Sequence, residues 1–215
     1  MSTEKMFGGE PVLKFGRETD RRSFLRYAGL VGVGAAFVAG GAMTSSSVAV
    51  AAPASGSTSD VDILNYALTL EYLESDFYTQ GLAANLLTGR DLELVSPIKD
   101  HEDAHVQAVT AAVRKLGGSP VPKPKITYPA DTFKSKAKFL ATAAQFEALG
   151  VVAYHGQVTL IKSGEILGAA ASIAGVESRH AAILAELTGG EPFPAPVEDH
   201  KPMSYVLPKV KPFLG

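Results

Sequence analysis

Two side chains that commonly bind metals, a carboxylate and an imidazole, stand three positions apart at Glu102 and His105. Positions i and i+3 of an α-helix lie on one face, so both side chains can reach the same point in space. A single pair of this kind is more often a solvated surface contact than a metal site. The chain repeats the pair 75 residues later, at Glu177 and His180. The repeat favours two metal-binding units, each carried by one helix.

Two further carboxylates, Glu71 and Glu147, stand in otherwise apolar helical stripes. A carboxylate on a core face is costly unless it is paired or bound to a metal. Each is followed seven positions later by a tyrosine, Tyr78 or Tyr154. Seven residues are about two helical turns, so each tyrosine lies on the face of its glutamate. The tyrosines could hydrogen-bond the carboxylates or donate electrons in oxidative chemistry, and simple packing with a satisfied hydroxyl is the alternative.

Four amphipathic helices are needed to position these residues. Hydrophobic periodicity and capping residues predict helices over about 60–81, 96–116, 131–162 and 165–187. Ser96 and Pro97 indicate the start of the second helix, Asp131 the start of the third, and Gly81 the end of the first. The proline-rich segment 119–129 cannot be helical, and the connection that contains it can span a bundle from end to end.

The expected turns bring the charged residues to one level. In an antiparallel hairpin, residues equidistant from the turn lie side by side, which pairs Glu147 with Glu177 and Glu71 with Glu102. Four buried carboxylates would repel one another without cations, and two divalent ions balance their charge. The predicted metal ligands are Glu71, Glu102, His105, Glu147, Glu177 and His180.

Residues 60 to about 190 resemble the ferritin-like superfamily, most closely exported bacterial ferritin-like domain proteins of the desiccation-related type. The segments 65–74 and 101–105 carry the resemblance. It implies an all-α ferritin-like four-helix bundle with a long crossover between helices two and three. It also implies that Glu102 and Glu177 bridge two metals, that Glu71 and Glu147 are terminal carboxylates, and that His105 and His180 each complete one metal.

Three neighbouring residues are weaker candidates. Glu74 could replace Glu71 as a ligand, but only Glu71 shows the tyrosine spacing that recurs at Glu147. We therefore expect Glu74 to be ion-paired or to lie beside a ligand. His101 and His155 point about 100° away from the metal-binding face, which favours the surface or contact with a ligand.

The first 51 residues resemble a twin-arginine signal peptide. The segment 20–26 holds paired arginines followed by Phe-Leu, although Asp20 stands where Ser or Thr is usual. An uncharged apolar stretch over 27–43 and an Ala-x-Ala cleavage site at 49–51 follow. The expected protein is exported to the periplasm, cell envelope or medium. A retained membrane anchor is the alternative, and it would be the chain's one contact with a membrane.

Two short segments flank the expected bundle. Residues 52–59 are predicted to be a linker. Residues 191–215 are predicted to form a proline-rich, extended C-terminal arm, with Phe193, Tyr205 and Phe213 packing on the bundle or on a partner. A disordered tail is the alternative.

Composition bounds the function. The chain has 215 residues, no cysteine for a thiolate site, and a net charge of −2 that argues against nucleic-acid binding. The leading hypothesis is a di-metal oxidoreductase of ferroxidase or peroxidase type that reacts with O2 or H2O2 in oxidative or desiccation stress. Iron is the preferred metal, and manganese with catalase-like chemistry is an alternative. A non-enzymatic metal-binding or structural stress protein and a storage cage also stay open, as does a homodimer.

Overall fold

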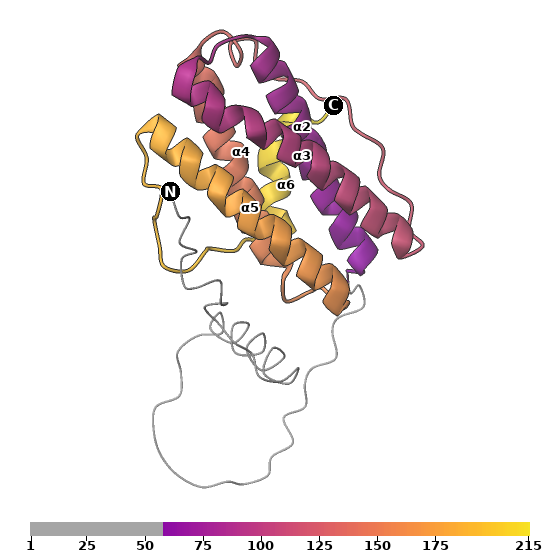
Figure 1. Ribbon diagram of the computed structural model, residues 1–215. Helices are drawn as coiled ribbons and strands as arrows, with labels where there is room; N and C mark the ends of the chain where they lie inside the picture. Colours follow the sequence, from indigo (N-terminus) through magenta and orange to yellow (C-terminus); the bar gives the residue numbers. More distant parts are fainter. Residues whose placement is uncertain (1–57) are drawn as a thin grey trace, which may run out of the picture. The chain divides into compact units, whose positions relative to one another are not determined.

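The computed structural model describes residues 58–215 of the chain. This part contains four long helices (Figure 1). They are α2 (Asp60–Ala83), α3 (Gly89–Lys115), α4 (Lys136–Gln157) and α5 (Gly164–Thr188). A short helix, α6 (Met203–Val210), and a 3-10 turn (Lys211–Phe213) follow. The predicted all-α four-helix bundle is confirmed. The predicted signal peptide and most of the predicted linker lie outside the described residues.

The crossover between the two helical hairpins runs along α2. The Asn65 amide nitrogen donates to the Ser119 carbonyl at 3.1 Å, and the Tyr128 hydroxyl donates to the Leu73 carbonyl, also at 3.1 Å. The chain thus returns to the other end of the bundle before α4 begins. At the start of α2, Asp60 accepts a hydrogen bond of 2.8 Å from the Ser163 N–H, just beyond α4. Helices α2 and α4 are therefore antiparallel, and the predicted long crossover is confirmed.

The predicted start of the second helix was wrong. Helix α3 begins at Gly89, and Pro97 lies inside it. A proline in a helix interior costs about 3 kcal/mol because it removes a hydrogen bond and crowds the preceding turn. Val95 and Ile98, on either side of it, are fully buried. Burial of two such aliphatic side chains stabilises the fold by about 3–6 kcal/mol, which offsets the proline.

Two other helix boundaries also differ from the predictions. Gly81, the predicted end of the first helix, lies inside α2, where a Cβ would be 2.0 Å from the ring of Phe139. This glycine permits close packing rather than ending the helix. Helix α4 begins later than predicted, because the Ser135 hydroxyl, and not Asp131, caps it by accepting from the Lys138 N–H at 3.3 Å. It ends at Gln157, before the predicted end near residue 162.

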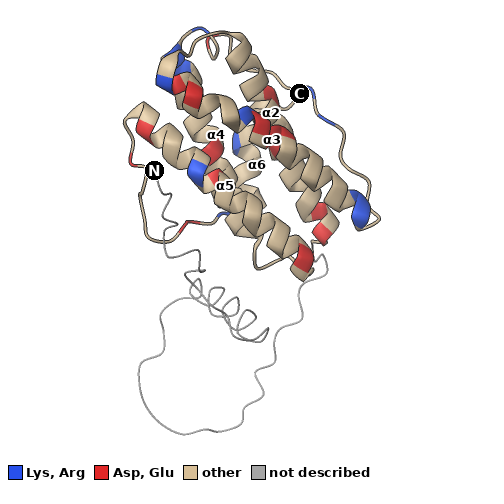
Figure 2. Ribbon diagram, in the orientation of Figure 1, with Lys and Arg blue, Asp and Glu red and all other residues tan. Residues whose placement is uncertain are grey.

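Two apolar clusters fill the bundle on either side of a charged layer. In one cluster the Phe77 ring stacks on Phe139 with centroids 5.1 Å apart. The other contains Leu68 and Val109. Along α3, Ile98 belongs to the first cluster and Val109 to the second, and the two buried residues between them are Glu102 and His105. Figure 2 shows acidic residues at this middle level of the bundle as well as at helix ends.

The C-terminal arm was predicted to be extended, but part of it forms the helix α6. Val206 and Val210 are buried against the bundle, since apolar residues four apart lie on one helix face. The segment before α6 lies close to α4, where the Lys201 N–H donates to the Val152 carbonyl at 2.9 Å. Among the expected aromatic contacts, Phe213 packs on a bundle phenylalanine, whereas Phe193 is 81% exposed.

No helix between residues 58 and 215 combines the length and hydropathy that crossing a membrane requires.

Candidate metal centre

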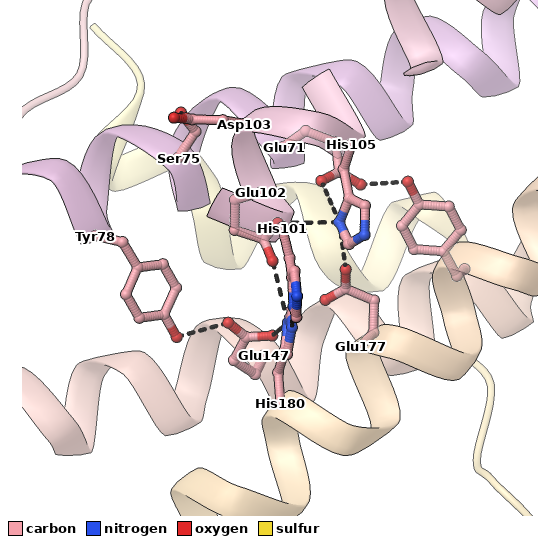
Figure 3. Close-up of polar contacts among 11 residues, drawn as sticks. Glu71, Ser75, Tyr78, His101, Glu102, Asp103, His105, Glu147, Glu177 and His180 are labelled. Atoms are coloured by element: carbon pink, nitrogen blue, oxygen red, sulfur yellow. Dashed lines mark hydrogen bonds and ion pairs between the residues drawn. The ribbon is translucent and has the colours of Figure 1, made fainter. Parts of the chain in front are cut away.

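The structure brings all six predicted ligands together in the charged layer between the apolar clusters (Figure 3). Helices α2 and α4 each supply one carboxylate, and α3 and α5 each supply a Glu-x-x-His pair. All six are buried, and the four carboxylates are fully so: Glu71, Glu102, His105, Glu147, Glu177 and His180.

Their ligand atoms form two groups, and within each group all the atoms lie within 4.8 Å of one another. Glu71 and His105 belong to the first group, and Glu147 and His180 belong to the second. Glu102 and Glu177 belong to both, as expected of carboxylates that bridge two ions. Such buried groups of carboxylates and imidazoles could hold metal ions. The ligand role of each residue stays a prediction.

Both histidines face the carboxylates with the same ring nitrogen. His105 Nδ1 lies 3.3 Å from Glu71 Oε2, 3.3 Å from Glu102 Oε2 and 3.1 Å from Glu177 Oε1. His180 Nδ1 lies 3.1 Å from Glu102 Oε1 and 3.2 Å from Glu147 Oε2. Nδ1 is therefore the nitrogen placed to bind a metal in each case.

Without metals, protons on the imidazoles provide the positive charge of the layer. Burial opposes charge on both rings, but their hydrogen bonds to carboxylates raise the pKa of His105 to about 12 and that of His180 to about 9. Burial likewise disfavours charge on Glu102, yet hydrogen bonds from the two imidazoles lower its pKa to about 2. The metal-free centre is thus held together by two imidazolium ions around Glu102.

Two imidazolium ions do not satisfy all the carboxylates. Burial, with further repulsion from Glu102, raises the pKa of Glu71 to about 7 and that of Glu177 well above its usual range. Among the described residues, Glu177 Oε2 has no polar partner, and Glu71 Oε2 is near an imidazole without being aligned for a hydrogen bond. Buried oxygen atoms of this kind, together with imidazole nitrogen, are ligands that iron and manganese accept. The donor set therefore fits divalent metal ions.

The two tyrosines bind glutamates across the bundle. Tyr78 of α2 donates a hydrogen bond of 2.6 Å to Glu147 Oε1 on α4, and Tyr154 of α4 donates to Glu71 Oε1 on α2. The sequence had placed each tyrosine on the face of the glutamate in its own helix. The antiparallel pairing of α2 and α4 instead gives each tyrosine the glutamate of the other hairpin. Burial raises the pKa of both tyrosines well above the usual value, so both remain neutral donors.

His101 contacts His180 at the edge of the centre (Figure 3). Its Nδ1 lies 2.9 Å from His180 Nε2, and the two rings are nearly parallel, with centroids 5.2 Å apart. Because His180 Nδ1 faces carboxylates, we assign its Nε2–H as the donor to His101. His155 is not part of the centre, and its Nδ1 pairs with the Val151 carbonyl at 2.8 Å.

Glu74 is a fifth buried carboxylate of the layer. Of the two expected alternatives, an ion pair or a place beside a ligand, the described residues show no ion pair, and Glu74 lies beside the predicted ligand Glu177. Gly150 makes room for it, since a Cβ there would be 3.2 Å from Glu74 Oε1 and 2.9 Å from Glu177 Oε2. Gly150 follows Glu147 by three residues, as Glu74 follows Glu71. Gly150, at the position equivalent to Glu74, was the sequence feature that could have indicated space for this carboxylate.

The sequence matches a family model described as a ferritin-like domain over residues 59–190, which include all four long helices. Among solved structures, the chain is similar to the crystal structure of a conserved hypothetical protein, rv2844, from Mycobacterium tuberculosis. The TM-score is 0.52 at 16% sequence identity, over 65% of this chain and 94% of that chain. A likeness at this identity shows the fold alone. No curated protein matches the sequence.

Proposed function

The chain belongs to the ferritin-like domain family, and on this basis we propose that it binds two divalent metal ions, preferably iron, and reacts with O2 or H2O2. The observation that carries the proposal is the sharing of Glu102 and Glu177 by two buried donor groups. One shared carboxylate comes from each hairpin, so the centre joins the two halves of the bundle.

A pair of iron or manganese ions, when bound, supplies the capacity to bind and reduce O2 or peroxide. The residues of the chain hold the donor groups together, orient the carboxylates and exclude water. Glu102 and Glu177 join the two donor groups, and the two crossed tyrosines hold the terminal carboxylates by hydrogen bonds that fix their orientation. The apolar clusters on either side keep bulk water away from the layer, which strengthens electrostatic interactions inside it.

We also propose that the protein acts outside the cytoplasm, in the cell envelope or beyond, as an exported ferritin-like protein of the desiccation-related type. The twin-arginine-like segment over 20–26 supports this proposal. Such signals carry proteins that are already folded, which would let the metals bind before export. An N-terminal sequence of the secreted protein beginning at residue 52 would support cleavage, and retention of residues 1–51 would favour an anchor.

Metal titrations of the metal-free chain test the function. Fe(II) and Mn(II) are added separately without oxygen, and bound metal per chain is measured; O2 or H2O2 is then supplied and its consumption followed. We expect two metals per chain and saturable oxidant consumption, both lost in Glu102→Ala. The matched control is Glu93→Ala, which removes an exposed carboxylate from the same helix.

The outcomes separate the candidate functions. Two bound metals without turnover would favour a non-enzymatic metal-binding protein. Oxygen release from H2O2 with manganese but not with iron would favour catalase-like chemistry. Many iron atoms per chain in a large particle would favour storage. A chain that binds no metal would overturn the proposal.

A further inference from the structure

A small cavity lies between α2, α4 and α6, at the margin of the first apolar cluster. The space open to the centre of a water-sized sphere is about 10 Å³, close to the minimum that one molecule of that size needs. Most of its lining is apolar and comes from Leu70, Leu73, Phe146, Leu149 and Val210. Glu74 and Gly150 complete the lining.

The inner end of this cavity reaches the metal centre at Gly150. A Cβ on Gly150 would be 2.9 Å from Glu177 Oε2 and 3.2 Å from Glu74 Oε1, so this space stays open only because the residue has no side chain. Glu177 belongs to both donor groups, and its Oε2 has no polar partner among the described residues. Gly150 therefore stands between the cavity and a predicted bridging carboxylate without a side chain that would block the way.

The outer wall of the cavity is thin. Phe146 and Leu149 line the cavity and also line the surface groove between α4 and α6 that Tyr205 and Lys209 border. Leu149 is only half-buried, and the side chains of such residues change rotamer within nanoseconds. A small molecule in the groove is therefore separated from the cavity by side chains alone.

A second small cavity, between α2, α4 and α5, does not offer the same path. Tyr154 lines that cavity, and its hydroxyl donates a hydrogen bond to Glu71. A whole aromatic side chain thus stands between that cavity and the nearest predicted ligand. At Gly150, by contrast, no side chain stands in this position.

The lining of the cavity beside Gly150 favours an apolar occupant. A buried water molecule needs about two to four hydrogen-bonding partners, and Glu74 is the one polar side chain in the lining. Hydrogen peroxide meets the same difficulty, because each of its two O–H groups needs an acceptor. O2 needs no hydrogen bond, and apolar cavities bind small apolar molecules such as xenon.

We propose that this cavity binds O2 and that O2 passes from it to the metal centre beside Gly150. Binding depends only on the shape and the apolar lining of the cavity, so it does not require bound metal. The passage of O2 to the metals rests on the proposed function. It makes O2, rather than H2O2, the oxidant that this route supplies.

Methyl NMR spectra of the metal-free protein, recorded under N2 and under O2, test the binding. Dissolved O2 is paramagnetic and speeds the relaxation of protons that it contacts. The methyl groups of Leu73 and Val210 should relax faster under O2 than those of Val109 and Val113, which are buried as deeply in the other apolar cluster. An O2 effect that is equal at the two pairs of residues would overturn the proposed binding.

A variant that fills the cavity links this effect to the site. Val210→Ile adds a methylene group to the cavity wall and should remove most of the excess relaxation at Leu73. Leu149→Phe serves the same purpose if the first variant does not fold. The matched control is Val206→Ile, at a buried valine one turn earlier on α6 that is not part of the lining, and it should leave the effect unchanged.

Stopped-flow oxidation of the Fe(II)-loaded chain tests the passage to the centre. The second-order rate constant for O2 should fall in Val210→Ile and stay at the wild-type value in Val206→Ile, with bound metal per chain unchanged in both. An unchanged rate constant in a variant that has lost the NMR effect would overturn the passage. A wild-type chain that binds iron but does not oxidise it would overturn the proposed function and the passage together, whereas the NMR comparison would still decide whether the cavity binds O2.

Discussion

The two ring nitrogens of His180 have different partners. Nδ1 contacts carboxylates, and Nε2 contacts His101. Hydrogen bonds to the far nitrogen of a metal-binding histidine fix its tautomer and ring orientation. In the proposed metal-bound protein, His101 would therefore act on a metal through His180 rather than by binding it. Burial, and then the neighbouring imidazole of His180, lowers the pKa of His101, so it remains a neutral acceptor at pH 7.

Substitution of His101 by alanine should weaken metal binding by about 10–100-fold, because His180 loses the group that orients it. Competition against a chromophoric chelator measures the change, and His101→Gln, which retains an acceptor, should restore part of the affinity. His155→Ala is the matched control, since that histidine bonds only its own helix. Equal affinities in the wild type and His101→Ala would contradict this role.

Loss of either tyrosine hydroxyl should destabilise the metal-free protein. Tyr78→Phe and Tyr154→Phe each leave a buried carboxylate oxygen without its donor, at a cost of about 1–3 kcal/mol in the free energy of unfolding. Urea unfolding measures it. Tyr72→Phe, at a half-buried position on α2, is the control. Losses no larger than the control's would show that the crossed hydrogen bonds contribute little.

At the scale of the helices, the sequence predicted the number, order and facing of the four long helices, but it missed α6 and not all the predicted boundaries were right. Apolar periodicity survives in any packing, so the four helices and the long crossover were predictable. The interior position of Pro97 and Gly81 depends on tertiary contacts, namely burial of the residues beside Pro97 and the Phe139 ring against Gly81. Local signals that usually end helices were outweighed by packing that spacing does not reveal.

The candidate site, too, was predictable where it depends on residue spacing and not where it depends on how the helices pack. Its six predicted residues were found because the Glu-x-x-His pairs recur after 75 residues and the two single glutamates, Glu71 and Glu147, recur after 76. The crossed partners of Tyr78 and Tyr154 depend on how α2 and α4 lie against each other, which helix periodicity does not determine. The position of Glu74 in the layer depends on the space left by Gly150 on another helix.

The contact between α4 and the segment before α6 depends on Gly156. A Cβ at this position would lie 1.9 Å from the Lys201 carbonyl oxygen, so Gly156→Ala must displace that segment. We expect a loss of about 1–3 kcal/mol in stability and faster hydrogen exchange at Val206 and Val210. Gly168→Ala, which meets nothing within 4 Å on α5, should instead stabilise the protein by about 1 kcal/mol. Unchanged exchange in Gly156→Ala would contradict the dependence of α6 on this contact.

For the molecule as a whole, the proposed metal ions would compete with protons for one buried layer. In the metal-free protein, burial raises the pKa of Glu71 from its usual 4.5 to about 7, so its contribution to stability is complete below 4.5 and lost as pH rises through 7. Burial opposes charge on His180, but hydrogen bonds to Glu102 and Glu147 raise its pKa from 6.5 to about 9, so its contribution is complete below 6.5 and lost through 9. Both groups therefore stabilise the metal-free protein less as pH rises.

We therefore expect the free energy of unfolding of the metal-free chain to fall between about pH 5 and pH 9, as measured by urea unfolding. Metal affinity should change in the opposite sense and rise with pH, because bound metals displace these protons. Calorimetry in buffers of different ionisation enthalpy counts the protons released. Metal affinity that does not vary with pH would contradict this competition.

The pairing of Glu74 with Gly150 breaks the internal symmetry of the two hairpins. The extra carboxyl interacts most strongly with Glu177 and then with Glu147, so it lies toward the donor group that contains His180. The two metal positions should therefore be inequivalent, and a calorimetric titration should fill them in two resolved steps. Glu74→Gln should bring the two binding constants closer together. A protein of this kind could hold two different metals in one centre, each in its own position.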